Sequence, residues 1–151
     1  MKLRDQMPEL TGATAWLNGQ YKKADLIGKK PTLIHFWSVS CSQCKDSMPD
    51  MNTFLHRYKG KFNVIAVHMP ISNDDLDLWE VKNAAARYGI TQPICVDSEL
   101  KVSDSFGTQY VPAYYVFDKD GKLRHYQSGG GGMRLLFQRL KRLLTEMNYR
   151  R

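Results

Sequence analysis

The chain has 151 residues, a length that suits one domain, 1–151, around one hydrophobic core. Its 42% hydrophobic and 25% charged residues are ordinary for a globular protein, and no run approaches the ~18 apolar residues of a membrane-spanning helix, so we expect no membrane partner. The net charge is +7, but aromatic residues do not alternate with the basic ones, so we expect a solvated basic surface rather than a nucleic-acid partner.

The N-terminal segment and the cysteine count both favour a cytoplasmic location. Residues 1–8 are polar and end in Pro8, unlike a signal peptide. Three cysteines are too few for the disulfide scaffold of a small secreted protein. Two of them form the motif Cys41-Ser42-Gln43-Cys44. In a cytoplasmic protein such a pair is more often catalytic or metal-binding than structural.

The first half of the chain predicts a strand–helix–strand unit. Residues 9–17, followed by Asn18-Gly19, predict a strand that enters a hairpin turn. Residues 31–39 form an apolar, aromatic-rich run that predicts a buried strand leading straight into the cysteine pair. Apolar residues recur at helical spacing through 45–60, and 62–69 predict a second buried strand. Such a unit has parallel strands and a right-handed crossover.

The second half continues the alternation of helices and strands. Before residue 107 we expect a helix, a short strand and a short helix, at 73–88, 93–97 and 100–106. The polar residues 73–75 are capping candidates for the first of these helices. The strand patterns 113–117 and 123–127 flank the turn sequence 118–121 and predict an antiparallel pair. A glycine run then leads into an amphipathic C-terminal helix.

The cysteine pair lies where a buried strand ends and a helix begins. The amides and macrodipole of that helix place partial positive charge near Cys41, which favours its thiolate and lowers its pKa below the ordinary value of about 8.5. Cys41 is therefore the expected attacking sulfur, and Cys44, one turn further in, the less exposed resolving thiol. In the expected cycle Cys41 attacks a substrate disulfide, a mixed disulfide forms, and Cys44 releases the reduced target.

Residues 36–45 (FWSVSCSQCK), followed by Pro49, resemble the active-site region of thioredoxin-like thiol–disulfide oxidoreductases. Residues 111–118 (VPAYYVFD) with Asp120-Gly121 resemble the second landmark of that family, a cis-proline loop leading into a hairpin. The strand at 64–68, with an extra helix and strand before the proline, is similar to the ResA/TlpA branch and especially to its YkuV-like bacterial members. The resemblance covers essentially the whole chain.

The resemblance implies an α/β thioredoxin fold, a three-layer α/β/α sandwich around a central mixed β-sheet, with an extra N-terminal hairpin and a helix–strand insertion. It also implies that Pro112 is cis and lies opposite Cys41, and that the backbone of Val111 pairs with an extended substrate chain. Taken by itself, Pro112 is equally compatible with the first position of a strand. We expect Pro49 to kink its helix, because proline lacks an amide donor.

Two acidic residues of the family pattern are missing. His35 replaces the buried aspartate that assists the second cysteine in thioredoxin, and Ser47 replaces the glutamate of ResA-like proteins. His35 is either a proton acceptor for Cys44, because imidazole titrates near neutral pH, or a hydrogen-bonded strand histidine. Trp37 either shelters the disulfide or packs in the core. Lys45 either adds positive charge near the thiolate or is a solvated helix residue.

Three alternative functions share parts of this pattern. A peroxiredoxin-type peroxidase requires a Pro-x-x-x-Thr/Ser-x-x-Cys setting, and residues 37–41 contain no such proline. A zinc module usually needs four ligands, and no second paired motif accompanies the first, so we expect no metal. A non-catalytic interaction domain on this scaffold can lose its cysteines, whereas this chain keeps both.

We therefore expect a thiol–disulfide oxidoreductase, a monomer that needs no cofactor and reduces protein or small-molecule disulfides with electrons from a separate donor. The direction of exchange depends on a reduction potential that the motif does not set. Cys95, between Ile94 and Val96, is expected to pack in the core as a small hydrophobic residue.

Overall fold

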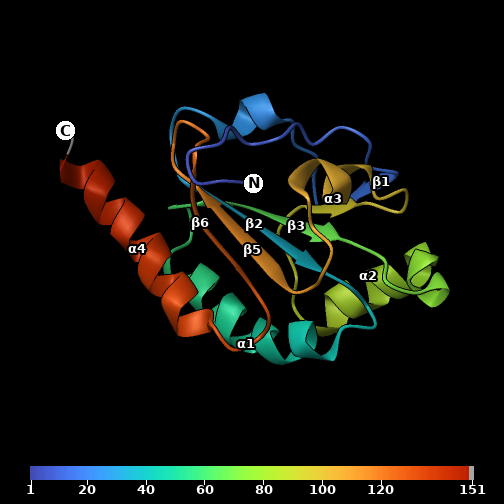
Figure 1. The fold of residues 1–151 in the computed structure, drawn as a ribbon. Coiled ribbons are helices and arrows are strands. Elements are labelled where there is room, and N and C mark those ends of the chain that lie inside the picture. The colour runs from blue at the N-terminus through green and yellow to red at the C-terminus, as the bar shows by residue number, and fades with distance from the viewer. Residues whose placement is uncertain (150–151) are drawn as a thin grey trace.

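The computed structural model describes residues 1–149, where six strands form one mixed sheet (Figure 1). Its strand order is β1-β4-β3-β2-β5-β6. The strands are β1 (Ala15–Leu17), β2 (Thr32–Trp37), β3 (Asn63–His68), β4 (Ile94–Val96), β5 (Ala113–Phe117) and β6 (Leu123–Ser128). The three central strands β2, β3 and β4 are parallel, and the other pairings are antiparallel. The predicted mixed sheet and the β5–β6 hairpin are confirmed.

Helices cover both faces of this sheet. They are α1 (Ser42–Arg57), α2 (Leu78–Arg87), α3 (Lys101–Phe106) and α4 (Met133–Tyr149), with two short 3₁₀ helices, η1 (Lys23–Leu26) and η2 (Asn73–Leu76). The apolar residues of α1, α2 and α4 join one buried cluster, and those of α3, η1 and the N-terminal segment join another. Figure 1 shows α1 and α4 on one side of the sheet and α3 on the other. The three-layer arrangement and the α2–β4 insertion are confirmed.

Every residue of β2 is buried, as expected of a central parallel strand. Because successive strand residues point to opposite faces, Leu33 and Trp37 belong to the cluster under α1, whereas Ile34 and Phe36 belong to the cluster under α3. The strand is therefore fixed from both sides. Its C-terminal end carries the loop that leads to the cysteine pair, so this loop starts from a rigid position.

The predicted N-terminal hairpin is wrong. The strand is confined to β1, which pairs with β4, and the chain continues into η1 after the turn. Asn18 and Gly19 both have positive φ, at 62° and 133°, a conformation that these two residue types tolerate. The side chain of Asn18 donates hydrogen bonds to the carbonyls of Ile90 (3.0 Å) and Gln92 (3.2 Å). These hydrogen bonds anchor the turn to the segment before β4. The strand β1 pairs with β4 instead of with a second strand of a hairpin.

The helix predicted at 73–88 is interrupted. It divides into η2 and α2, because Asp77 has an extended backbone and its carboxylate accepts a hydrogen bond from the Trp79 amide (2.9 Å). An aspartate in this conformation is a favourable N-cap, so a new helix starts there. Pro49 lies inside α1; the kink expected of it stays a prediction. The single domain 1–151 also stays a prediction, and its last residues, Arg150 and Arg151, lie outside the described part of the chain.

Candidate active site

The two cysteines of the motif lie at the N-terminus of α1 and form a disulfide. Cys41 is the N-cap residue, with an extended backbone, and its Sγ accepts a hydrogen bond from the Cys44 amide at 3.1 Å. Cys41 is 7% exposed and Cys44 is 1% exposed. The positive end of the helix therefore faces the more accessible sulfur, where it stabilises a thiolate once the disulfide is reduced. This is the arrangement that the sequence predicted.

The loop between β2 and α1 is anchored to the end of the neighbouring strand. The Met69 amide donates to the Trp37 carbonyl (2.8 Å), and the Val39 amide donates to Nε2 of His68 (3.3 Å). His68 is fully buried, and this burial lowers its pKa to about 4. The ring is therefore neutral at pH 7 and available as an acceptor. His68 therefore holds this loop, residues 38–41 and here called the redox loop, by accepting the Val39 amide.

A buried carboxylate, that of Asp75 in η2, also holds this loop. Its Oδ2 accepts hydrogen bonds from the hydroxyls of Ser38 (2.6 Å) and Ser40 (2.7 Å) and from the amides of Ile71 (3.0 Å) and Ser72 (3.2 Å). Burial by itself raises the pKa of Asp75, but these hydrogen bonds outweigh it and hold the pKa below its ordinary value. The sequence indicated only a helix cap here. No local pattern marks the contact, because Asp75 is 35 residues from Ser40.

Pro112 lies at the same edge of the sheet as the redox loop. Ala113, the first residue of β5, pairs with Phe36 near the C-terminal end of β2. The Val111–Pro112 peptide bond is cis, the geometry that the family resemblance implied. Val111 packs against the buried cluster that contains Cys41 and Cys44. The structure therefore brings the second landmark beside the first, and the pairing of the Val111 backbone with a substrate chain stays a prediction.

His35 does not have the titration behaviour expected of it. Its side chain is buried, and burial lowers the pKa of His35 to about 4 rather than leaving it near neutrality. Nε2 lies 2.7 Å from the side-chain amide of Gln92, and the ring stacks on Tyr114 at 6.4 Å. The ring is therefore neutral at pH 7, and a role of His35 as proton acceptor for Cys44 stays a prediction. The contact with Gln92 is the hydrogen bond expected of a strand histidine.

The remaining candidates have mainly packing contacts. Trp37 is buried in the same cluster as the cysteines and packs edge-to-face on His68, with ring centroids 4.9 Å apart. The Nζ of Lys45 lies over the ring of Tyr88 at 5.7 Å from its centroid, so this lysine links α1 to α2. Ser47, in the position of the family's glutamate, donates a hydrogen bond to the Gln43 carbonyl (2.9 Å).

The third cysteine lies on the opposite face of the sheet. Cys95 is fully buried in the cluster under α3, and burial raises its pKa to about 12. It therefore stays protonated and packs as a hydrophobic residue, which confirms the expectation. Within residues 1–149 no group of three or more histidine, cysteine or acidic side chains is arranged to hold a metal ion. The redox pair accordingly has no metal-ligating neighbours in this part of the chain.

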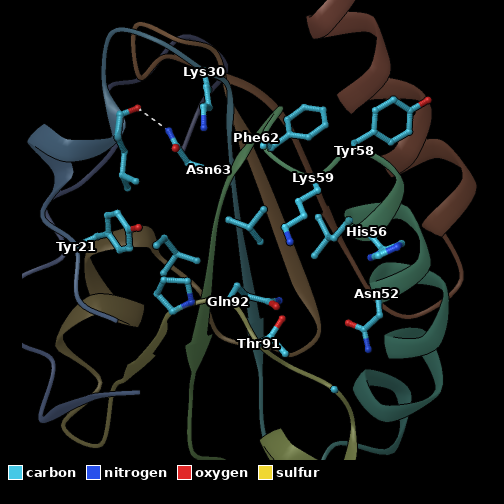
Figure 2. A pocket seen from close by; sticks show the side chains of 17 residues that line it. Tyr21, Lys30, Asn52, His56, Tyr58, Lys59, Phe62, Asn63, Thr91 and Gln92 are labelled. Carbon is cyan, nitrogen blue, oxygen red and sulfur yellow. Dashed lines mark hydrogen bonds between the residues drawn. The ribbon is translucent and has the colours of Figure 1, made fainter. Parts of the chain in front are cut away.

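A cavity of about 670 Å³ lies apart from the redox pair (Figure 2). Figure 2 shows side chains of α1, among them Asn52 and His56, facing Tyr21 and Asn63 across it. Neither cysteine nor Pro112 is among the described residues that line it. Asn63 begins β3, whereas the redox loop contacts the other end of that strand, so the cavity opens at the opposite end of the sheet. The cavity is therefore not part of the redox site.

A disulfide at the start of a helix, on a thioredoxin-like mixed sheet and beside a cis-proline, defines a thiol–disulfide oxidoreductase. The chain belongs to the AhpC/TSA family, whose sequence model matches residues 3–126. Over 146 residues it is 58% identical to the thiol–disulfide oxidoreductase YkuV of Bacillus subtilis, covering 97% of this chain and 99% of YkuV. A solution structure of a thioredoxin-like protein in the oxidized form, also 58% identical, superimposes with a TM-score of 0.90 over 97% of this chain and 99% of that one.

More distant relatives include the thiol–disulfide oxidoreductase ResA of Bacillus anthracis. It is 34% identical over 100 residues, which are 66% of this chain and 54% of ResA. These relatives confirm the expected family and enzyme class, and they do not favour the peroxiredoxin alternative. Among the helices of residues 1–149, none combines the length and the apolar character needed to cross a bilayer.

Proposed function

We propose that the enzyme reduces disulfide bonds of protein substrates, with Cys41 as the attacking thiolate and Cys44 as the resolving thiol. The observation that carries the proposal is the position of Cys41, which caps α1 and accepts the Cys44 amide at its sulfur. Positive charge from the helix end stabilises the nucleophile there. Cys44 is one turn further in and almost fully buried, so it reacts with a partner that Cys41 has already captured.

The proposed cycle transfers two electrons from the enzyme dithiol to the substrate. The Cys41 thiolate attacks one sulfur of the substrate disulfide, a Cys41–substrate bond forms, and the other substrate sulfur leaves as a thiolate. Cys44 loses its proton and attacks the sulfur of Cys41. The mixed disulfide then breaks, the second substrate sulfur leaves, and the enzyme holds the Cys41–Cys44 disulfide seen in the structure. A separate electron donor restores the dithiol.

Exposed apolar side chains near the redox loop support a polypeptide substrate. Four of them lie in residues 71–79, the first segment of the insertion between β3 and α3. Each is 38–67% exposed: Ile71, Leu76, Leu78 and Trp79. The carboxylate of Asp75, from the same segment, contacts the loop before Cys41. Exposed apolar groups concentrated beside a site are typical of protein-binding surfaces. Pairing of the substrate backbone with Val111 would hold an extended chain there without selecting its sequence.

The proposed setting is the cytoplasm of a bacterium, where the enzyme acts as a monomer and binds neither nucleic acid nor membrane. The low cysteine count supports a reducing compartment. The basic residues Arg139, Lys141 and Arg142 occupy exposed positions of α4, which supports a solvated surface. The proposed substrates of the same chemistry include small-molecule disulfides.

A redox titration of the Cys41–Cys44 couple tests the direction of exchange. We expect a reduction potential at or below the cytosolic glutathione poise, that is, below about −220 mV. A potential well above that value would contradict a reductase and indicate an oxidase or isomerase. A peroxide-consumption assay provides the second test, since fast turnover of peroxide by Cys41 would favour the peroxidase alternative.

A further inference from the structure

We propose that Asp75 is a positioning residue of the redox site: its buried carboxylate holds the loop before Cys41 through the hydroxyls of Ser38 and Ser40, and thereby sets the reduction potential of the cysteine pair. The inference depends on thiol–disulfide exchange at Cys41 and Cys44 but not on its direction. It therefore deepens the proposed function and can fail separately from it.

One oxygen atom connects two segments that are far apart in the sequence. The Oδ2 of Asp75 accepts two hydrogen bonds from the redox loop, at 2.6 Å and 2.7 Å, and two from amides at the start of the insertion, at 3.0 Å and 3.2 Å. Hydroxyl–carboxylate hydrogen bonds of this length are charge-assisted and roughly twice as strong as neutral ones. The carboxylate of Asp75, in its ionised form, therefore links the redox loop to η2.

Within residues 1–149, the hydroxyls of both serines have Asp75 as their hydrogen-bond partner. Ser38 is completely buried, and a buried hydroxyl without a partner is costly, so its hydrogen bond to Asp75 determines where this side chain lies. Ser40 is exposed, so packing does not restrain it, and its hydroxyl is nevertheless directed to the same oxygen. Ser40 directly precedes Cys41. The carboxylate therefore limits the freedom of the backbone that carries the attacking sulfur.

The position of Cys41 affects the stability of the disulfide. Closing a ring between two thiols is favoured when both are already held close together, because the effective concentration of one near the other is then high. A loop that is fastened to Asp75 keeps Cys41 at the N-cap, within reach of Cys44. Releasing the loop lowers that effective concentration. The disulfide is then reduced more easily, and the couple becomes more oxidising.

The test measures the equilibrium constant of the Cys41–Cys44 couple with glutathione. We expect Asp75→Asn to shift this constant about fivefold toward the dithiol, within the range of couplings between contacting residues. The double variant Ser38→Ala/Ser40→Ala should shift it in the same direction, and adding Asp75→Asn to that background should add little. Ser40→Thr, which keeps the hydroxyl, should retain the wild-type value.

Asp97 provides a matched control. It is also a completely buried aspartate, and it accepts hydrogen bonds from the Val102 amide (3.0 Å) and from the amide and hydroxyl of Ser103 (both 2.7 Å), but its donors lie in α3 rather than in the redox loop. Asp97→Asn and the milder Ser103→Ala should lower the stability of the fold and leave the equilibrium constant unchanged.

Three results would overturn the proposal: an unchanged constant in Asp75→Asn, an equal shift in the Asp97 and Ser103 controls, or fully additive effects of Asp75 and the serine pair. If Asp75→Asn does not fold, Ser40→Ala decides the question, because this exposed residue tolerates truncation. An unchanged constant in Ser40→Ala would then refute the role of the carboxylate. Because no protein substrate enters the measurement, a failed reductase assignment leaves this result intact.

Discussion

The chemistry of the site depends on a small difference between two residues of the same type. Cys41 is at the N-cap and retains some exposure, whereas Cys44 lies inside the first turn and is almost fully buried. The more accessible sulfur is also the one that the helix amides stabilise. We therefore expect the two cysteines to have separate tasks, capture of the substrate by Cys41 and its release by Cys44.

Serine substitutions separate these tasks. We expect Cys41→Ser to abolish reduction of insulin disulfides, because the attacking thiolate is gone. Cys44→Ser should retain the first step and accumulate a mixed disulfide, since no thiol remains to resolve it. Mass spectrometry under non-reducing conditions detects this adduct. Undiminished insulin reduction by Cys41→Ser would contradict the mechanism.

Two buried histidines predict how stability depends on pH. Burial lowers the pKa of His35 and of His68 to about 4, below the ordinary value of 6.5. Between these values the unfolded chain binds protons that the folded protein does not, so the free energy of unfolding should be highest above pH 6.5. It should fall by roughly 1.4 kcal/mol per pH unit for each histidine as the pH decreases toward 4. Urea unfolding at several pH values measures this slope.

His35→Gln is the corresponding control, because glutamine does not titrate. Its slope between pH 6.5 and 4 should be about half that of the wild type, with His68 accounting for the rest. A stability that is independent of pH across this window, or an imidazole NMR signal of His35 that titrates near 6.5, would contradict the assignment of a neutral buried ring.

At the level of elements, the insertion between β3 and α3 (residues 69–100) enters both proposals. Its first segment contacts the redox loop through Asp75, and the same segment carries exposed apolar side chains. The short helix η2 ends at Asp77, whose carboxylate starts α2. This break in the helix presents Leu76, Leu78 and Trp79 to solvent next to the segment that contacts the loop.

Truncating Trp79 tests this surface. We expect Trp79→Ala to raise KM for a protein disulfide several-fold, by an amount typical of a lost aromatic contact of ~1–2 kcal/mol. The rate with a small disulfide such as oxidised glutathione should not change, because the redox pair is untouched. Leu3→Ser is a matched control, since Leu3 is 64% exposed and Trp79 is 67% exposed. Equal effects of both variants, or an equal loss with the small disulfide, would argue against a docking role.

At the scale of the whole molecule, the sheet separates two buried clusters with different tasks. The cluster under α1, α2 and α4 contains the redox pair, and the cluster under α3 and the N-terminal segment contains Cys95. Phe36 anchors the second cluster, with Phe106 and Tyr115 edge-to-face at 5.3 Å and 5.5 Å. The second cluster therefore supports the central strand without contributing a sulfur to the chemistry.

Phe36→Ala tests this division. Removing a fully buried aromatic side chain should lower the free energy of unfolding by about 3–5 kcal/mol, measured by urea denaturation. The reduction potential of the protein that remains folded should stay at the wild-type value. The void left by the removed ring lies on the face of the sheet opposite to the cysteines. A large shift in potential would show that the two faces are coupled.

Sequence patterns alone were enough to predict the order of most elements, the central strands and the redox pair. These features have local signals: apolar runs define β2, β3 and β5, and two cysteines three residues apart meet within one helical turn. The family resemblance added the cis peptide bond before Pro112, which no local pattern could have predicted.

The contacts that join distant segments could not be predicted without the folded structure. Asn18 meets Ile90 across 72 residues, which redirects the N-terminal turn, and Asp75 meets Ser38 across 37. The neutral state of His35 is likewise a result of complete burial, which its own sequence position does not reveal. Hydrogen bonds and desolvation depend on which groups the fold brings together. The sequence motif is enough to predict the reactive sulfurs, whereas the side chains that hold the redox loop are known only from the folded structure.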